Sequence, residues 1–145
     1  MAEKVTEEVF NFLKNQDPKL CVIATSSKTG KPECAVMGYA VMDGLTVILS
    51  TDKTSRKWQN LKENPLVALT FGWSFEELNI QYEGRVELAE TGKALKECER
   101  VYFRSHPEAV EFKGLPETVF IKVIPQWLRL SDYTVDPARF EEVTF

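Results

Sequence analysis

The residues best suited to chemistry stand together in the segment Ser50–Lys57, whose sequence is STDKTSRK. This octet holds four hydroxyl side chains and three cationic ones. Thr54 or Ser55 is a natural N-cap for a helix that begins just after it, because both side chains accept hydrogen bonds from free backbone N–H groups. A helix N-terminus attracts anions, so Arg56 and Lys57 in its first turn complete a seat for a phosphate dianion. The alternative is a solvated basic turn, since charged side chains are mostly exposed.

The length and net charge of the chain limit the classes of protein to which it can belong. The chain has 145 residues, a formal charge of −4 and a pI near 5.2, so we expect one domain over residues 1–145 with a sizeable core. The acidic balance argues against nucleic acid as a partner, because proteins that bind nucleic acid usually carry a basic face. No apolar run is long enough to cross a membrane, and the N-terminus is acidic where a signal peptide would be basic and then apolar. We therefore expect no membrane partner and a cytoplasmic location.

Cysteine and histidine are too sparse for a metal centre. Cys21, Cys34 and Cys98 lack the C-x-x-C spacing of zinc sites, and His106 is the single histidine of the chain. The same scarcity argues against a Cys-His or Ser-His catalytic pair. We expect the cysteines to be plain core thiols, and we assign neither a metal ligand nor a catalytic residue.

The pattern of apolar residues predicts a mainly β fold with flanking helices. Apolar side chains recur at helical spacing over residues 3–15 and 91–104, and a short helix carries Trp58 and Leu61 until Asn64-Pro65 ends it. Apolar or alternating runs predict strands at 20–25, 33–41, from Leu45 onward, 66–71, 78–89, 119–124 and 126–130.

The connections between these runs indicate how the strands are arranged. Short links imply antiparallel neighbours joined as a meander. Residues 105–117 are expected to be a loop or a broken helix, and the tail 134–145 a strand-like arm or a surface strap. Six or seven antiparallel strands with helices outside them make a small closed or partly closed barrel. Nine Phe, four Tyr and three Trp residues are more than one small barrel easily hides, which favours a homodimer.

A set of short motifs follows a fixed order along the first two thirds of the chain. In chain order the motifs are Thr29-Gly30-Lys31-Pro32, Thr51, Ser55-Arg56-Lys57, Asn64-Pro65, Phe71-Gly72-Trp73 and Tyr82-Glu83-Gly84-Arg85-Val86-Glu87. Each is weak alone, but their order over about seventy residues is informative. Together they resemble the pyridoxamine 5′-phosphate oxidase-like family of FMN-binding split barrels. The likeness covers residues 18 to 90 well and the C-terminal third loosely.

The resemblance implies a split β-barrel that works as a homodimer, with one FMN at each end of the subunit interface. Family members hold the FMN phosphate with a threonine at a strand end and with an Arg-Lys pair. The corresponding residues here are Thr51, Arg56 and Lys57, with Ser50 and Ser55 close by.

Contacts to the flavin ring are implied on three further segments. The strand after the G-x-P turn runs along the ring in such proteins, and its residues here are Ala35, Val36, Met37 and Gly38. A polar residue just before the Tyr82 motif faces the ring edge, which points to Asn79 or Gln81. A late strand supplies contacts from the partner subunit, which points to Trp127.

At several positions this sequence differs from the vitamin-converting oxidases of the family, and these differences limit the activities that we expect of it. In those enzymes the second strand opens with an arginine and closes with a lysine that help to hold the flavin, whereas the matching positions here are about Ala35 and Gly38. The arginine and histidine that grip their substrate phosphate have no counterpart, since His106 stands in an unrelated context. The resemblance is therefore to the short, uncharacterised flavin-binding relatives, not to a true pyridoxamine-phosphate oxidase.

Three functions are compatible with the sequence. The first is a flavin-dependent oxidoreductase with a small-molecule substrate or a nicotinamide donor, in which the cofactor carries the chemistry and the protein orients it. The second is a non-catalytic module that carries, stores or senses a flavin, a deazaflavin or haem. The third is a structural dimer with a vestigial pocket, in which Arg56 and Lys57 pair with acidic side chains.

Overall fold

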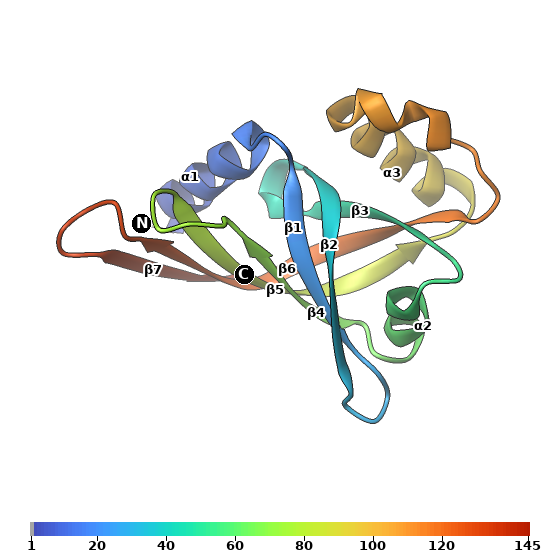
Figure 1. Ribbon diagram of the computed structural model, residues 1–145, viewed down its shortest axis with the longest axis horizontal. Coiled ribbons are helices and arrows are strands. Elements are labelled where there is room, and N and C mark those ends of the chain that lie inside the picture. Colours follow the sequence, from blue (N-terminus) through green and yellow to red (C-terminus); the bar gives the residue numbers. More distant parts are fainter. Residues whose placement is uncertain (1) are drawn as a thin grey trace.

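A seven-stranded antiparallel sheet that curls into a barrel dominates the computed structural model, which describes residues 2–145 (Figure 1). The strands are β1 (Leu20–Ser26), β2 (Pro32–Val41), β3 (Val47–Asp52), β4 (Leu66–Phe71), β5 (Leu78–Ala89), β6 (Thr118–Asp132) and β7 (Arg139–Thr144). Side chains alternate between buried and exposed along β4 and most of β5, as expected for strands with one face on the core. The mainly β, antiparallel fold predicted from the sequence is confirmed.

Pairing between β3 and β6 closes the barrel. The sheet order is β3-β2-β1-β4-β5-β6-β7, and β3 also pairs with β6, which leaves β7 as an extension outside the six-stranded ring. The expected meander holds within β1–β3 and within β4–β7 but not between these halves. The chain passes from β3 through a helix and returns as β4 beside β1.

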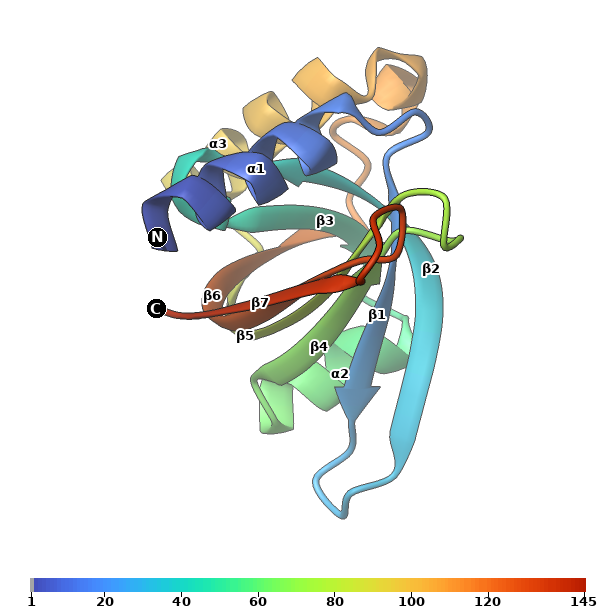
Figure 2. The same cartoon turned by 90° about the vertical axis from the view of Figure 1, so that its left-hand side faces the viewer.

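Three α-helices flank the sheet in the described range. They are α1 (Ala2–Asn15), α2 (Arg56–Glu63) and α3 (Gly92–Ser105), and two 3₁₀ helices, η1 (Asp43–Leu45) and η2 (Pro107–Phe112), complete the elements. α1 buries Val5, Val9 and Leu13, which recur every four residues on one face. α1 and α3 cover one side of the barrel, and α2 lies on the other (Figures 1 and 2). Within residues 2–145, no helix is long and apolar enough to span a membrane.

Two buried tyrosines fasten outer elements to the core. The Tyr39 hydroxyl donates a hydrogen bond to the Leu13 carbonyl at 2.6 Å, and the Tyr82 hydroxyl donates one to the Leu45 carbonyl at 2.8 Å. The Phe71 ring stands edge-on to both phenols, with ring centroids 4.9 and 6.2 Å apart. Burial raises the pKa of both tyrosines, so they stay neutral donors. These bonds tie α1 to β2 and η1 to β5.

β2 separates from β3 along most of its length. Residues 39–41 of β2 pair with β3, whereas in the described chain residues 32–38 pair with β1 alone. The β1–β2 hairpin therefore projects as an arm away from β3, with α2 beside it (Figures 1 and 2). We call the gap between residues 32–38 and β3 the split. Along it, one edge of β2 keeps free backbone N–H and C=O groups.

The two late strands predicted on either side of Pro125 form one continuous strand, β6. A β-bulge permits this: Glu83 of β5 pairs with Trp127 and Gly84 pairs with Pro125, which leaves Gln126 without a partner on β5. Proline lacks an N–H group to donate and is tolerated in a sheet at such irregularities. The prediction of a break at this position is therefore corrected to a bulge.

The third strand begins at Val47 and not at Leu45. Gly44 and Leu45 have φ values of 79° and 66°, in the left-handed region, and belong to η1. Leucine in that region costs about 1–2 kcal/mol. Burial of the Leu45 side chain and the hydrogen bond from Tyr82 to its carbonyl hold this turn in place.

The turn between β4 and β5 allows a test of how closely the backbone packs around Gly72. Gly72 has a φ of +92°, and a Cβ at that position would lie 2.2 Å from the Leu78 carbonyl oxygen. Gly30, in the β1–β2 turn, has a similar φ of +94° but open space around it. We expect Gly72→Ala to lower the free energy of unfolding by about 3 kcal/mol or more and Gly30→Ala by roughly 1–2 kcal/mol. Urea denaturation measures both, and equal losses would contradict the close packing at Gly72.

Candidate functional site

The octet Ser50–Lys57 forms the end of β3, a turn and the start of α2. Ser55 is the N-cap: its hydroxyl accepts a hydrogen bond from the Trp58 backbone N–H at 3.2 Å. The Thr51 hydroxyl, itself buried, donates to the Ser55 hydroxyl at 3.1 Å. This bridge fixes the helix start against the strand end. The N-cap predicted at Thr54 or Ser55 is thus Ser55.

Two hollows open in the split on either side of Lys57. The first has a volume of about 80 Å³ and the second about 360 Å³, and Lys57 lines both. The other residues of the first hollow are Ile23, Thr25, Glu33, Cys34, Ala35 and Arg56. Those of the second are Met37, Ser50, Thr51, Asp52, Ser55, Tyr102, Phe103, Ala109, Phe112, Leu115 and Thr118.

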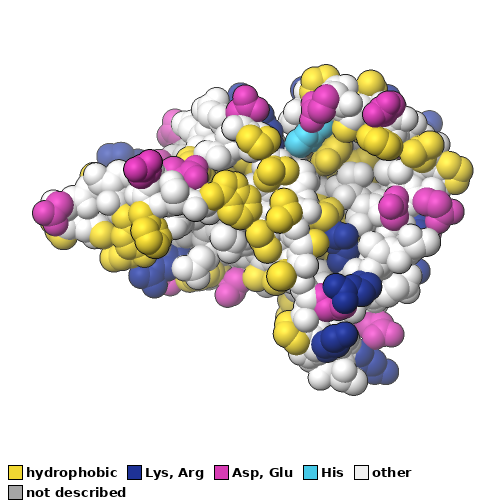
Figure 3. All heavy atoms as spheres, in the orientation of Figure 1, with side chains coloured by type: hydrophobic (Ala, Val, Ile, Leu, Met, Phe, Trp, Pro, Cys, Tyr) yellow, Lys and Arg dark blue, Asp and Glu magenta, His cyan; other side chains and the backbone are white. Residues whose placement is uncertain are grey.

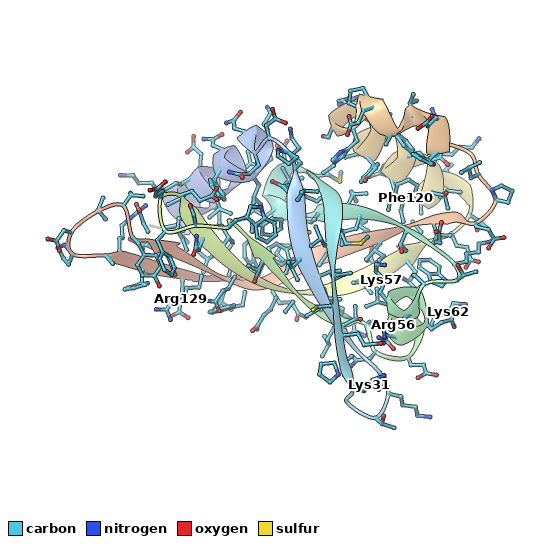
Figure 4. The ribbon with its side chains drawn as sticks, viewed as in Figure 1. Lys31, Arg56, Lys57, Lys62, Phe120 and Arg129 are labelled. Carbon is cyan, nitrogen blue, oxygen red and sulfur yellow. The ribbon has the colours of Figure 1, made fainter. Side chains whose placement is uncertain are left out.

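Basic side chains concentrate at this opening. Figure 4 places Arg56 and Lys57 at the start of α2, between that helix and β2, and Figure 3 shows basic side chains gathered over α2 and the β1–β2 arm. Burial lowers the pKa of Lys57, and the nearby Arg56 lowers it further, while Asp52 acts in the opposite direction. An anion placed beside Lys57 would favour its charged form.

A carboxylate lies inside this basic site. Glu33, whose side chain is only 12% exposed, forms an ion pair with Arg56. Its Oε1 accepts a hydrogen bond from the Asn60 side chain at 2.9 Å, and the same amide donates to the Thr25 hydroxyl at 3.0 Å. The hydrogen bond from Asn60, followed by the charges of Arg56 and Lys31, holds the pKa of Glu33 below its usual range.

Sequence reasoning missed both Glu33 and Asn60. A usable signal was the alternation along β2, because Glu33, Ala35 and Met37 share the face that lines the hollows. Asn60 carried no such signal. It is a buried polar residue in a helix, and its role depends on a partner 27 positions away in the chain.

The C-terminal part of α3 and the following η2 roof the second hollow. Tyr102, Phe103 and Phe112 supply its aromatic surface. His106, which joins the two helices, places Nε2 at 2.6 Å from the Tyr39 carbonyl oxygen and Nδ1 at 3.1 Å from Glu108 Oε1. Its ring also stacks on Tyr102 at a centroid distance of 4.5 Å. His106 thus anchors the roof to β2, a role that the sequence did not reveal.

Seven of the predicted site residues line the two hollows. They are Ala35, Met37, Ser50, Thr51, Ser55, Arg56 and Lys57. Two other predicted residues on β2 lie elsewhere. The Val36 side chain is 62% exposed on the opposite face of the strand, as alternation requires. Gly38 faces a separate hollow beside His106.

Asn79 and Trp127 also lie apart from the hollows. The Asn79 amide donates to the Ser74 carbonyl at 2.8 Å in the β4–β5 turn. The Trp127 indole donates to Glu142 Oε1 at 3.0 Å, between β6 and β7. Within one chain, the structure does not bring these two residues to the octet.

The fold and this opening define a class: a split β-barrel with a basic, hydroxyl-rich helix start at the gap between two strands. A sequence profile of the family described as Pyridoxamine 5′-phosphate oxidase matches residues 5–132. The chain belongs to this family.

Relatives in sequence agree with the assignment. A pyridoxine/pyridoxamine 5′-phosphate oxidase of Ehrlichia chaffeensis is 36% identical over 73 residues, which cover 50% of this chain and 37% of that protein. An uncharacterised protein of Methanocaldococcus jannaschii is 35% identical over 101 residues, 68% of this chain and 65% of that protein. The chain spans about two fifths of the length of the first oxidases that it matches.

Solved structures share the fold at low identity. A haem binding protein from Mycobacterium smegmatis has a TM-score of 0.79 at 15% identity, covering 96% of this chain and 57% of that one. A pyridoxamine 5′-phosphate oxidase-related, FMN binding protein from Nostoc punctiforme has a TM-score of 0.70 at 9% identity, covering 99% and 95%. The split-barrel fold implied by the sequence motifs is therefore confirmed.

The hydroxyl bridge at the octet predicts a measurable contribution to stability. Ser55→Ala removes the cap of α2 and leaves the Thr51 hydroxyl without its acceptor, so we expect the free energy of unfolding to fall by about 1–2 kcal/mol. Thr91→Ala is the matched control, because Thr91 occupies the N-cap of α3 but its side chain makes no capping hydrogen bond within the described residues. That control should change stability by less than about 0.5 kcal/mol. Equal urea midpoints for the two variants would contradict the bridge.

Proposed function

We propose that the chain binds FMN in the split, with the phosphate in the first hollow and the ring along the second. The observation that carries the proposal is that Lys57 lines both a small polar hollow beside Arg56 and a larger one with an aromatic roof. Two cations and the start of α2 suit a phosphate. Met37, Tyr102 and Phe103 suit a flat, largely apolar ring. Bound flavin would supply electron or hydride transfer.

The chain's own groups would hold and orient the cofactor. Ser50 and Thr51 line the second hollow next to Lys57. The Ser50 hydroxyl can donate to phosphate or ribityl oxygens, whereas the Thr51 hydroxyl already donates to Ser55. The free edge of residues 32–38 offers backbone donors and acceptors to the polar rim of a heterocycle. The roof from α3 and η2 would exclude water from one side of the ring.

We further propose a homodimer with the flavin site at the subunit interface. Asn79 and Trp127, the ring neighbours implied by the resemblance, lie apart from the hollows of their own chain, so a partner subunit would have to supply them. Large exposed apolar side chains support an interface, because a partner subunit would remove them from water. They include Val36, Leu66, Trp73, Phe75 and Phe140.

The activity we propose is that of an FMN-dependent oxidoreductase acting on a small molecule, with a nicotinamide as electron donor, in the cytoplasm. Conversion of pyridoxamine phosphate is not proposed, because Ala35 and Gly38 stand near the positions where those oxidases carry an arginine and a lysine. The redox chemistry would belong to the flavin, so the hollows need no acid or base of their own.

A carrier or sensor that binds flavin, deazaflavin or haem is the second candidate, and the likeness to the Mycobacterium smegmatis haem binding protein favours it. The geometry of His106 argues against haem. Histidine is a common axial ligand of haem iron, but both nitrogens of this single histidine face the Tyr39 carbonyl and the Glu108 carboxylate. Anaerobic NADH or NADPH separates the remaining options, because it bleaches the flavin of an oxidoreductase and not that of a carrier.

The octet predicts a specific loss of FMN binding. Arg56→Ala with Lys57→Ala removes both cations of the first hollow, and we expect the FMN dissociation constant to rise about 100-fold or more, because each charged hydrogen bond contributes roughly 1.5–3 kcal/mol. Riboflavin, which lacks the phosphate, should lose little affinity. Lys62→Ala, an exposed charge at the other end of α2, is the control. Quenching of flavin fluorescence measures all three, and unchanged FMN affinity in the double variant would overturn the proposal.

The shared site predicts complementation between two defective subunits. We expect the Arg56→Ala/Lys57→Ala variant and an Asn79→Ala/Trp127→Ala variant each to bind FMN weakly as homodimers. After mixing and subunit exchange, half of the dimers are mixed and carry one intact site, so roughly a quarter of all sites should regain FMN. Sedimentation at micromolar concentration should show a dimer throughout. A monomer that binds FMN tightly, or no recovery on mixing, would contradict a site built from two chains.

A further inference from the structure

An acidic side chain lies inside the proposed phosphate site, where it would repel the phosphate. Glu33 lines the first hollow together with Arg56 and Lys57, and its carboxylate forms an ion pair with Arg56. We propose, on the basis of the proposed function, that Glu33 determines specificity: it cancels the charge of Arg56, and the hollow therefore selects a flavin with a singly charged phosphate over one with a phosphate dianion.

The carboxylate is built into the site. The Asn60 amide, which is buried within α2, holds Glu33 Oε1 at 2.9 Å and is itself oriented by the Thr25 hydroxyl at 3.0 Å. Burial of the Glu33 side chain would disfavour its charge, but the hydrogen bond from Asn60 outweighs this effect and keeps the carboxyl ionised at neutral pH. Glu33 is therefore a fixed negative charge at the hollow.

The balance of charges follows from the groups that face the hollow. Arg56 and Lys57 bring two positive charges and Glu33 one negative charge. Lys31, at 4.0 Å from Glu33, is largely exposed and screened by solvent. Asp52 acts on Lys57 from the second hollow and makes the site still less positive. A dianion would leave uncompensated negative charge in a partly buried place, whereas a monoanion is balanced.

Two chemical forms carry a single phosphate charge. A phosphomonoester such as FMN becomes a monoanion as the pH falls through its second pKa, near 6. A phosphodiester, such as that in the tail of a deazaflavin or a dinucleotide, carries one charge at every pH from 5 to 9. Three probes with the same ring separate these cases: riboflavin is neutral, riboflavin 4′,5′-cyclic phosphate is a monoanionic diester, and FMN is mostly a dianion above pH 7.

The inference can be tested on the wild-type protein by measuring the affinity of each probe as a function of pH. We expect FMN affinity to rise at least tenfold from pH 8 to pH 6, while the affinities of riboflavin and the cyclic phosphate change less than threefold. At pH 8 the cyclic phosphate should bind more tightly than FMN. The two control probes report any effect of pH that does not act through the phosphate. A flat pH profile for FMN would overturn the inference.

Glu33→Gln removes the charge and keeps a side chain that can bond to Asn60. We expect this variant to bind FMN about tenfold more tightly at pH 8, to lose the pH dependence, and to bind riboflavin as the wild type does. Glu63→Gln, which removes an exposed charge from the C-terminal end of α2, is the matched control and should change none of these values. Unchanged or weaker FMN binding by Glu33→Gln at pH 8 would show that Glu33 only positions Arg56. If the wild type binds none of the three probes, the proposal of flavin binding itself is overturned.

Discussion

The organising constraint of this structure is that β2 can pair with β3 over residues 39–41 only. One edge of β3 pairs along its whole length with β6, which closes the barrel, whereas the other edge pairs with β2 only over Val47–Leu49, so the rest of the β1–β2 hairpin projects away from β3. The resulting split gives a backbone edge, a floor from α2 and a roof from α3 and η2 in one place. Loss of a few ladder hydrogen bonds is thus the structural origin of the candidate site.

The positive charge in the split is partly compensated by an acidic side chain. The octet alone suggests a strong phosphate site, but Arg56 faces Glu33, and burial lowers the pKa of Lys57. One sequence-based alternative paired both Arg56 and Lys57 with acidic side chains, and the structure shows such a pair for Arg56. The same pairing that weakens the attraction for a dianion also limits the repulsion between two adjacent cations, so the site is polar, preorganised and selective in charge.

Much of the fold was predictable because it depends on local periodicity. The alternation in β5, the helical stripe of α1 and the Ser55 cap all follow from neighbouring residues. The features that the sequence did not predict depend on contacts between residues far apart in the chain. Whether Pro125 ends a strand depends on a bulge formed with Gly84 of β5, and the function of Asn60 depends on Glu33. A single sequence indicates which face of a strand is buried, but not which edge stays unpaired.

Tyr39 occupies the last position at which β2 still touches β3, and both covering layers attach to it. Its hydroxyl holds α1 through Leu13, and its carbonyl holds the roof through His106. The start of the segment after His106 is held to β2 by the hydrogen bond from that imidazole. In protein engineering terms, the segment 107–117, which holds η2 and the loop after it, is therefore the natural place for grafting new sequence, because it can be lengthened or exchanged to reshape the second hollow while the barrel strands stay unchanged.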